Sequence, residues 1–141
     1  MKIQTILATK GTRVLTTPAS QSLDEVVAAL AQHNVGALVV VDDAGRPVGI
    51  ISERDILSAL ARREDFARPV SAAMTRAVIV GSPQDDVASV MKTMTERRFR
   101  HLPIMEGDKL VGIVSIGDMV KAQLEQYQGE IETLETQIIG G

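Results

Sequence analysis

The chain has 141 residues with 15 Lys and Arg against 18 Asp and Glu, and the resulting net charge of −3 excludes a protein that holds nucleic acid by bulk positive charge. Its lack of cysteine excludes disulfides and thiolate metal sites, and an aromatic content of 2% excludes a stacking platform for single-stranded nucleic acid. The apolar runs are too short to cross a bilayer and the first residues carry no signal-peptide pattern, so we expect a cytoplasmic protein that does not act at a membrane.

An internal repeat organises the sequence. The block VGIISERD at residues 48–55 returns as VGIVSIGD at residues 111–118, 63 positions later. Apolar residues upstream of the block match at an offset of 64, which indicates that one residue was dropped near Ala44. We therefore divide one domain of residues 1–141 into repeats at 14–60 and 78–124, a connector at 62–76 and a C-terminal helical extension at 125–141.

Each repeat predicts the same elements in the same order, namely strand, helix, strand, strand and helix. In the first repeat, a short strand at 14–15 precedes a helix that opens with a capping-box pattern at residues 22–25. The continuous apolar run at 37–41 predicts a buried strand, and a second strand follows at 47–51. A second helix is expected to begin at Ser52.

The second repeat predicts a helix over residues 87–94, strands at 102–105 and 110–114, and a last helix from Ser115. One repeat has fewer than about fifty residues, which is near the size at which a chain cannot bury enough surface alone. We therefore expect an α/β (α+β) fold in which a pseudo-twofold pair of β-α-β-β-α units packs through its sheets, followed by a long C-terminal helix.

The starts of the two last helices form the first candidate site. Ser52 and Ser115 each stand at a strand-to-helix switch, and Asp55 and Asp118 follow them three residues later. In one interpretation, serine and aspartate only cap the helix, each accepting a hydrogen bond from the other's backbone. In the other, the carboxylate at the helix N-terminus accepts hydrogen bonds from both hydroxyls of a ribose. The two roles are compatible.

A basic cluster at the entrance of a buried strand forms the second candidate site. It consists of Arg97, Arg98, Arg100 and His101. Arg97 and Arg98 fit a solvated helix end, whereas a planar guanidinium at the mouth of the strand suits a phosphate. The corresponding residues 35–37 of the first repeat are small and apolar, and they are better matched to an adenine face.

No pattern of a catalytic or metal site is legible in the sequence. His33 is expected on the surface of a helix end, and two distant histidines without cysteine do not make a transition-metal site. Residues 112–117 have the glycine spacing of a phosphate-binding loop, but Asp118 stands where that loop needs its lysine. We therefore predict that the protein is not an enzyme.

The C-terminal extension carries a stripe of apolar residues. Their spacings are 4, 3, 4, 3 and 4, as in the a and d positions of a coiled coil, and the residues are Val120, Leu124, Tyr127, Ile131, Leu134 and Ile138. The stripe covers less than three heptads and contains Gly129. It predicts either pairing with a second copy, as a homodimer, or a helix docked on its own domain.

These features resemble a known family. The tandem units, the paired Gly-Ile-Ile/Val-Ser-x-x-Asp blocks and the segment RHLPI at 100–104 are similar to the cystathionine-β-synthase (CBS) domain pair, or Bateman module. The resemblance covers about residues 14–124. The sequences at residues 10–12 and 49–55 are similar to those of small stand-alone bacterial members, which have no catalytic domain.

The resemblance implies two clefts between the repeats, which we call the Asp118 cleft and the Asp55 cleft. In the Asp118 cleft, Ser115 and Asp118 would hold a ribose, Arg100 and His101 a phosphate, and the adenine would lie among Lys10, Thr12, Val35, Gly36 and Ala37. In the Asp55 cleft, Ser52 and Asp55 would hold the ribose, Arg54 the phosphate, and the base would lie among Thr75, Val78 and Phe99. Val14 and Pro103 complete the predicted set.

The resemblance also implies a function. It predicts a non-catalytic regulatory module that senses cellular energy by binding AMP, ADP or ATP, and that pairs as a homodimer. Two neighbouring clefts could instead accept one dinucleotide such as NAD(H). The alternative interpretation is a protein-interaction module that binds no nucleotide and serves only assembly.

Overall fold

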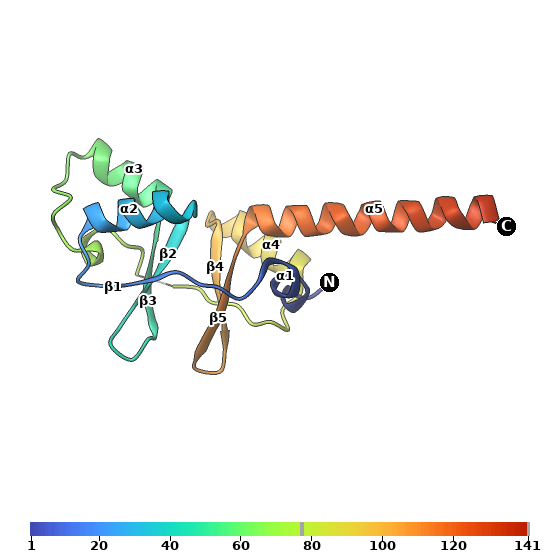
Figure 1. Cartoon of the computed structure of the whole chain (residues 1–141), viewed down its shortest axis with the longest axis horizontal. Coiled ribbons are helices and arrows are strands. Elements are labelled where there is room, and N and C mark those ends of the chain that lie inside the picture. The colour runs from blue at the N-terminus through green and yellow to red at the C-terminus, as the bar shows by residue number, and fades with distance from the viewer. Residues whose placement is uncertain (77, 141) are drawn as a thin grey trace.

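The computed structural model describes residues 1–76 and 78–140, and its elements follow the order that the repeat predicts (Figure 1). The first repeat contains β1 (Thr16–Pro18), α2 (Leu23–His33), β2 (Ala37–Val41), β3 (Pro47–Ser52) and α3 (Glu53–Ala61). The second contains α4 (Val87–Arg97), β4 (His101–Glu106), β5 (Lys109–Ser115) and α5 (Ile116–Gly140), and the 3-10 turn η1 (Val70–Ala72) lies between them. This is the predicted mixed fold with a long C-terminal helix.

The predicted first strand of each repeat is wrong in its position or extent. β1 begins at Thr16 rather than at Val14, because it pairs in parallel with β2 and places Thr17 opposite Val40 in the interior. In the second repeat, the corresponding strand is reduced to a single parallel bridge between Gly81 and Ile104. The position of an edge strand depends on its neighbour in the sheet, which local sequence does not specify.

An N-terminal helix, α1 (Ile3–Lys10), was not predicted and packs on the second repeat rather than on the first. Its apolar residues Ile3, Ile6 and Leu7 are buried in the core of the second repeat, where α1 contacts β5 and α5. The backbone of Ile3 donates a hydrogen bond to the carbonyl of Asp85 at 2.9 Å, just before α4. The chain therefore starts on the second repeat and crosses over to build the first.

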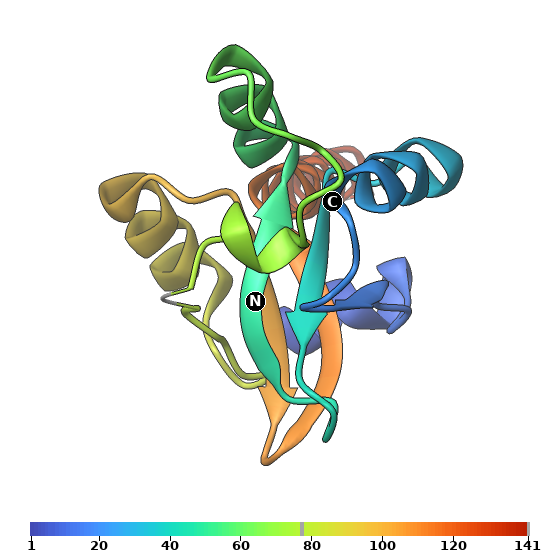
Figure 2. The same cartoon turned by 90° about the vertical axis from the view of Figure 1, so that its left-hand side faces the viewer.

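Each repeat contributes one sheet with its own hydrophobic core. The sheets have the orders β1-β2-β3 and β4-β5. Figures 1 and 2 show the two sheets side by side, with the turns of both antiparallel hairpins at the same end. The first core contains Leu23, Val26, Leu30, Leu38, Val40, Ile51 and Val70, and the second contains Val87, Met94, Leu102, Ile104, Val114 and Met119 together with the residues from α1.

Sheet register places the two strand-to-helix switches at corresponding points. Ser52 at the end of β3 lies opposite Ala37 at the start of β2, and Ser115 at the end of β5 lies opposite His101 at the start of β4. Both switches are at the end of the sheets away from the hairpin turns. The pseudo-twofold relation between the repeats therefore brings the two candidate aspartates to the same end of the molecule.

The helix α5 extends away from the two sheets (Figure 1). Its first turns are anchored by buried Met119, but five later apolar residues are exposed by 50% to 81%, namely Leu124, Tyr127, Ile131, Leu134 and Ile138. The interpretation that this helix docks on its own domain is therefore wrong. Among the described residues, no helix, α5 included, combines the length and the apolar character needed to cross a membrane.

Candidate functional site

The two helix starts have the same hydrogen-bonded geometry. The Ser52 N–H donates to Asp55 Oδ2 at 2.9 Å, and the Asp55 N–H donates to Ser52 Oγ at 3.4 Å. The Ser115 N–H donates to Asp118 Oδ2 at 2.8 Å, and the Asp118 N–H donates to Ser115 Oγ at 3.0 Å. The capping prediction is therefore confirmed at both positions. Capping stabilises each helix end and also fixes the orientation of the carboxylate.

Capping uses only one oxygen of each carboxylate. In the described part of the chain, every hydrogen bond to Asp55 and Asp118 falls on Oδ2. Oδ1 of each residue has lone pairs that a donor on a ligand can reach. A capping role and a binding role are thus compatible in the observed geometry, because they use different atoms.

Lys10 distinguishes Asp118 from Asp55. Its Nζ donates to Asp118 Oδ2 at 2.6 Å and to the carbonyl of Ile113 at 2.9 Å, so it joins the end of α1 to β5 and α5. Burial opposes ionisation of Asp118, but the hydrogen bonds from Lys10 and from the Ser115 N–H outweigh it and lower the pKa of the carboxyl. Asp118 is therefore a carboxylate at neutral pH, paired with a cation from another element.

The Asp118 cleft is a cavity of about 370 Å³ with walls from both repeats. The second repeat supplies Ser115, Asp118 and His101, and the first supplies the apolar segment of residues 35–37. A Cβ at Gly36 would lie 3.1 Å from His101 Nε2, so a larger residue at this position would require the His101 ring to shift slightly. Lining residues that the sequence analysis did not assign to it are Arg13, Leu15, His33, Asn34 and Ile113.

The Asp55 cleft is smaller, about 210 Å³, and richer in arginine. Five of its predicted residues line it, namely Ser52, Arg54, Asp55, Thr75 and Phe99. It is also lined by Ile50, Glu53, Arg98, Arg100 and His101. The cleft thus combines the carboxylate of Asp55 with three guanidinium groups and the aromatic ring of Phe99.

Arg100 lines the Asp55 cleft, whereas the sequence analysis placed it beside Asp118. The left-handed backbone of Arg98, with φ 59°, ends α4 and turns the chain toward the first repeat before β4 begins. Asn34 ends α2 with the same conformation, φ 52°, and lines the opposite cleft. The segment after α2 therefore faces the start of α5, and the segment after α4 faces the start of α3. Because the two segments are equivalent in the repeat, the sequence could have indicated that each lies beside the other repeat.

His101 lines both clefts and is their common wall. Burial, the nearby cation of Lys10 and that of Arg100 lower the pKa of the imidazole, while Glu53 and Asp118 oppose this effect. His101 is therefore neutral at pH 7. It can donate one hydrogen bond as a neutral ring, and a bound anion would favour its protonation.

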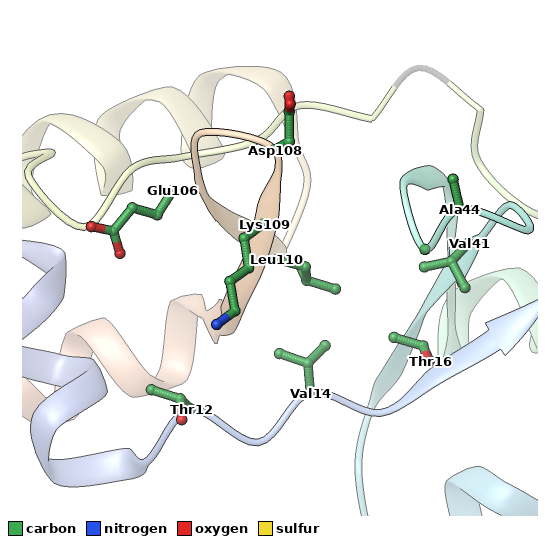
Figure 3. Close-up of a pocket in the computed structure, with 10 residues that line it drawn as sticks. Thr12, Val14, Thr16, Val41, Ala44, Glu106, Asp108, Lys109 and Leu110 are labelled. Atoms are coloured by element: carbon green, nitrogen blue, oxygen red, sulfur yellow. The ribbon is translucent and has the colours of Figure 1, made fainter.

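Four predicted residues line neither cleft. Thr12 and Val14 line a third cavity of about 620 Å³ at the hairpin end of the sheets, between the β2–β3 turn and the β4–β5 turn. Figure 3 shows Val14 on the side of this cavity where Leu110 lies, and Thr16 on the side where Val41 lies. Val78 follows the connector, and Pro103 is buried in β4. The described residues contain no cluster of three or more His, Asp or Glu that could hold a metal ion.

Comparison with known proteins identifies similar sequences and folds. The family model for the CBS domain matches residues 8–62 and 70–125. The crystal structure of the CBS-domain protein ATU1752 from Agrobacterium tumefaciens is 38% identical and has a TM-score of 0.83, covering 86% of this chain and 92% of that chain. The chain spans between 32% and 83% of the length of curated relatives that it matches.

Two similar structures contain ligands. The CBS domain protein PAE2072 from Pyrobaculum aerophilum, complexed with AMP, is 29% identical with a TM-score of 0.76, over 84% of this chain and 89% of that chain. The CBS domain pair of MJ0100, in complex with 5-methylthioadenosine and S-adenosyl-L-methionine, is 28% identical with a TM-score of 0.80, over 89% and 98%.

Proposed function

Because this chain belongs to the CBS-domain family and carries two CBS domains in tandem, we propose that it is a regulatory module that binds adenosine nucleotides in the Asp118 and Asp55 clefts. The observation that carries the proposal is the pair of helix-start carboxylates, each with Oδ1 unused inside a cleft built from both repeats. The AMP complex and the 5-methylthioadenosine complex of similar structures support an adenosine ligand.

The side chains of each cleft suggest how the ligand is held. Asp118 Oδ1 or Asp55 Oδ1 accepts hydrogen bonds from the two ribose hydroxyls, which is charge-assisted and selects a ribose over a deoxyribose. In the Asp118 cleft, the adenine lies against residues 35–37, and Lys10, Arg13 and His101 face the phosphate. In the Asp55 cleft, Arg54, Arg98 and Arg100 give a more cationic phosphate site beside Phe99.

Thermal denaturation with AMP, ADP, ATP and NADH tests the proposal. At about a hundredfold excess over Kd, a ligand that binds only the folded state adds roughly 2.7 kcal/mol of stability. We expect a rise in Tm of about 5–10 °C for a domain of this size. Absence of a rise with every ligand would reject nucleotide binding and favour the alternative role in assembly alone.

Asparagine variants separate binding from capping. Asn retains a side-chain acceptor for the cap but lacks the charge, so Asp118→Asn and Asp55→Asn should each remove one binding event and the double variant both. Asp86 is the matched control, because it caps α4 by accepting from the Ser89 N–H at 3.1 Å and lines neither cleft. Asp86→Asn should leave binding unchanged. Full binding by the double variant would mean that the aspartates only cap.

One observation favours a second ligand class. His101 lines both clefts, so the phosphates of a dinucleotide such as NAD(H) could lie beside it with one nucleoside in each cleft. Calorimetry distinguishes the two modes by stoichiometry, since a dinucleotide gives one molecule per chain and mononucleotides give two.

A further inference from the structure

The exposed face of α5 carries a continuous apolar surface that its own domain does not cover. We call it the α5 stripe; its exposed fractions run from 43% to 81%, and it consists of Val120, Leu124, Tyr127, Ile131, Leu134 and Ile138. The alternating spacing of 4 and 3 residues keeps these side chains on one side of a helix. Figure 1 shows that most of α5 projects beyond the two sheets. An isolated stripe of this kind needs a partner to bury it.

The polar residues beside the stripe exclude an anionic lipid surface as that partner. Between Val120 and Ile138 the helix has four glutamates and one cation, Lys121, which lies at the end nearest the domain. An amphipathic helix that lies on a membrane carries basic residues on its polar face, because the headgroups are acidic. The partner must therefore be a protein surface that tolerates an acidic rim.

We propose that the α5 stripe packs against the α5 stripe of a second copy of this chain, with the two helices antiparallel and centred at Gly129. The stripe is symmetric about that position. Leu124 lies level with Leu134 of the second copy, Tyr127 with its Ile131, and Val120 with its Ile138, and position 129 is the midpoint of each pair. Each large side chain thus meets a different residue rather than its own copy, so Tyr127 packs beside an isoleucine.

Charge at the flanking positions selects this orientation over the parallel one. With the stripe at a and d, the e positions are Lys121, Gln128 and Glu135, and the g positions are Gln123, Glu130 and Gln137. Antiparallel helices bring e beside e and g beside g. Lys121 then meets Glu135 of the second copy twice per dimer, at the cost of one contact between the two Glu130 residues.

The parallel arrangement has the opposite charge balance. It brings each g position beside the next e position of the second copy, which places Glu130 against Glu135 twice and leaves Lys121 without an acidic neighbour. The antiparallel pair therefore has two attractions and one repulsion, whereas the parallel pair has two repulsions. Antiparallel pairing also places the two domains at opposite ends of the paired helices.

Charge reversal gives a test in which the two orientations differ in sign. Glu135→Lys turns both antiparallel attractions into Lys–Lys contacts and should raise the dimer Kd, measured by sedimentation of the full chain, by about threefold to tenfold. In the parallel arrangement the same variant makes two new Glu–Lys contacts and lowers the Kd. The exchange variant Lys121→Glu with Glu135→Lys should restore the original Kd. Gln126→Lys, on the outer face, is the control.

Distances between spin labels give a second test that does not depend on stability. The chain has no cysteine, so Gln128→Cys and Gln137→Cys each provide a single labelling site on an exposed position outside the stripe. Antiparallel helices centred at Gly129 separate the two Gln137 positions by about 24 Å along the axis but the two Gln128 positions by only about 3 Å. Equal short distances at both sites would overturn the proposal, and so would a monomer at all concentrations.

Discussion

The Asp55 and Asp118 clefts are two versions of one site. Both have a serine and an aspartate in reciprocal hydrogen bonds at a helix start, and both receive the end of a helix from the other repeat. They differ in where their cations come from. At Asp118, Lys10 from α1 forms an ion pair with the carboxylate. At Asp55, three arginines line the cleft, and the carboxylate accepts hydrogen bonds from its capping residue Ser52.

This difference shows how a duplicated scaffold can acquire two specificities. The backbone hydrogen bonds that set the geometry are repeated, because the Glu53 N–H donates to the carbonyl of Gly36 at 3.0 Å and the Ile116 N–H to that of Arg100 at 2.9 Å. The side chains around that frame are free to diverge. Gly36 and Arg100 occupy equivalent positions, yet Gly36 adds no side chain to the Asp118 cleft whereas Arg100 places a guanidinium in the Asp55 cleft.

The largest expected effect comes from removing that guanidinium. Arg100→Gln, measured in an Asp118→Asn background that leaves only the Asp55 cleft, should weaken AMP binding about tenfold to a hundredfold, because a hydrogen bond to a charged group contributes roughly 1.5–3 kcal/mol. Adenosine, which lacks the phosphate, should bind equally to both proteins. Titration calorimetry measures both ligands.

The control for this variant is Arg97→Gln, since Arg97 is exposed on α4 and lines neither cleft. Unchanged AMP affinity after Arg100→Gln would show that the phosphate does not lie at Arg100. The two clefts would then differ in volume but not in how they hold a phosphate.

A smaller effect is expected from pH, through the histidine that the clefts share. The pKa of His101 is lowered, chiefly by burial and then by Lys10 and Arg100, and a bound phosphate would raise it again. AMP affinity should therefore increase as the pH falls from 8 toward 6, by less than about tenfold per unit because one proton is taken up. Adenosine affinity should stay constant.

The His101→Gln variant should remove this dependence on pH. The stability of the protein without ligand should change with pH in the opposite direction from the AMP affinity, decreasing as the pH falls. Because the folded-state pKa lies below the unfolded value of about 6.5, unfolding takes up a proton, and the contribution of His101 to stability is lost as the pH falls through that range. An AMP affinity that is flat with pH in the wild type would place the phosphate away from His101.

Sequence alone predicted the parts of this molecule that depend on local or repeated signals. The block at 48–55 and 111–118 predicted the two capped helix starts, since the serine and aspartate that form a cap lie three residues apart. The strands β2 to β5 begin and end within two residues of the expected positions, because continuous apolar runs mark buried strands. These features need no knowledge of distant contacts.

The parts that were missed depend on contacts between segments far apart in the sequence. Ile3, Ile6 and Leu7 have helical spacing, but the pattern is too short to predict α1, and its partners β5 and α5 begin only at Lys109 and Ile116. Arg100 faces the Asp55 cleft because of the turn at Arg98, where arginine has no intrinsic preference for a left-handed backbone. A strand such as β1 takes its register from β2.

The smallest expected effect tests whether Lys10 is what makes the Asp118 cleft different. Lys10→Met keeps the aliphatic stem but removes the ion pair, which is partly exposed, so the free energy of unfolding at pH 7 should fall by only about 0.5–1 kcal/mol. The folded-state pKa of Asp118 lies below its unfolded value of about 3.9, and this stabilisation is therefore lost as the pH falls through the folded-state pKa.

The difference in stability between wild type and Lys10→Met should accordingly shrink as the pH falls through the folded-state pKa of Asp118, and urea unfolding over a series of decreasing pH values from pH 7 measures it. Lys2→Met is the matched control, since Lys2 also reaches the second repeat but donates to the neutral amide of Gln84 at 2.9 Å. Its effect should be independent of pH. A Lys10→Met deficit that stays constant over the whole acid series would show that Lys10 acts through packing or through the Ile113 carbonyl, and the asymmetry between the clefts would then not be electrostatic.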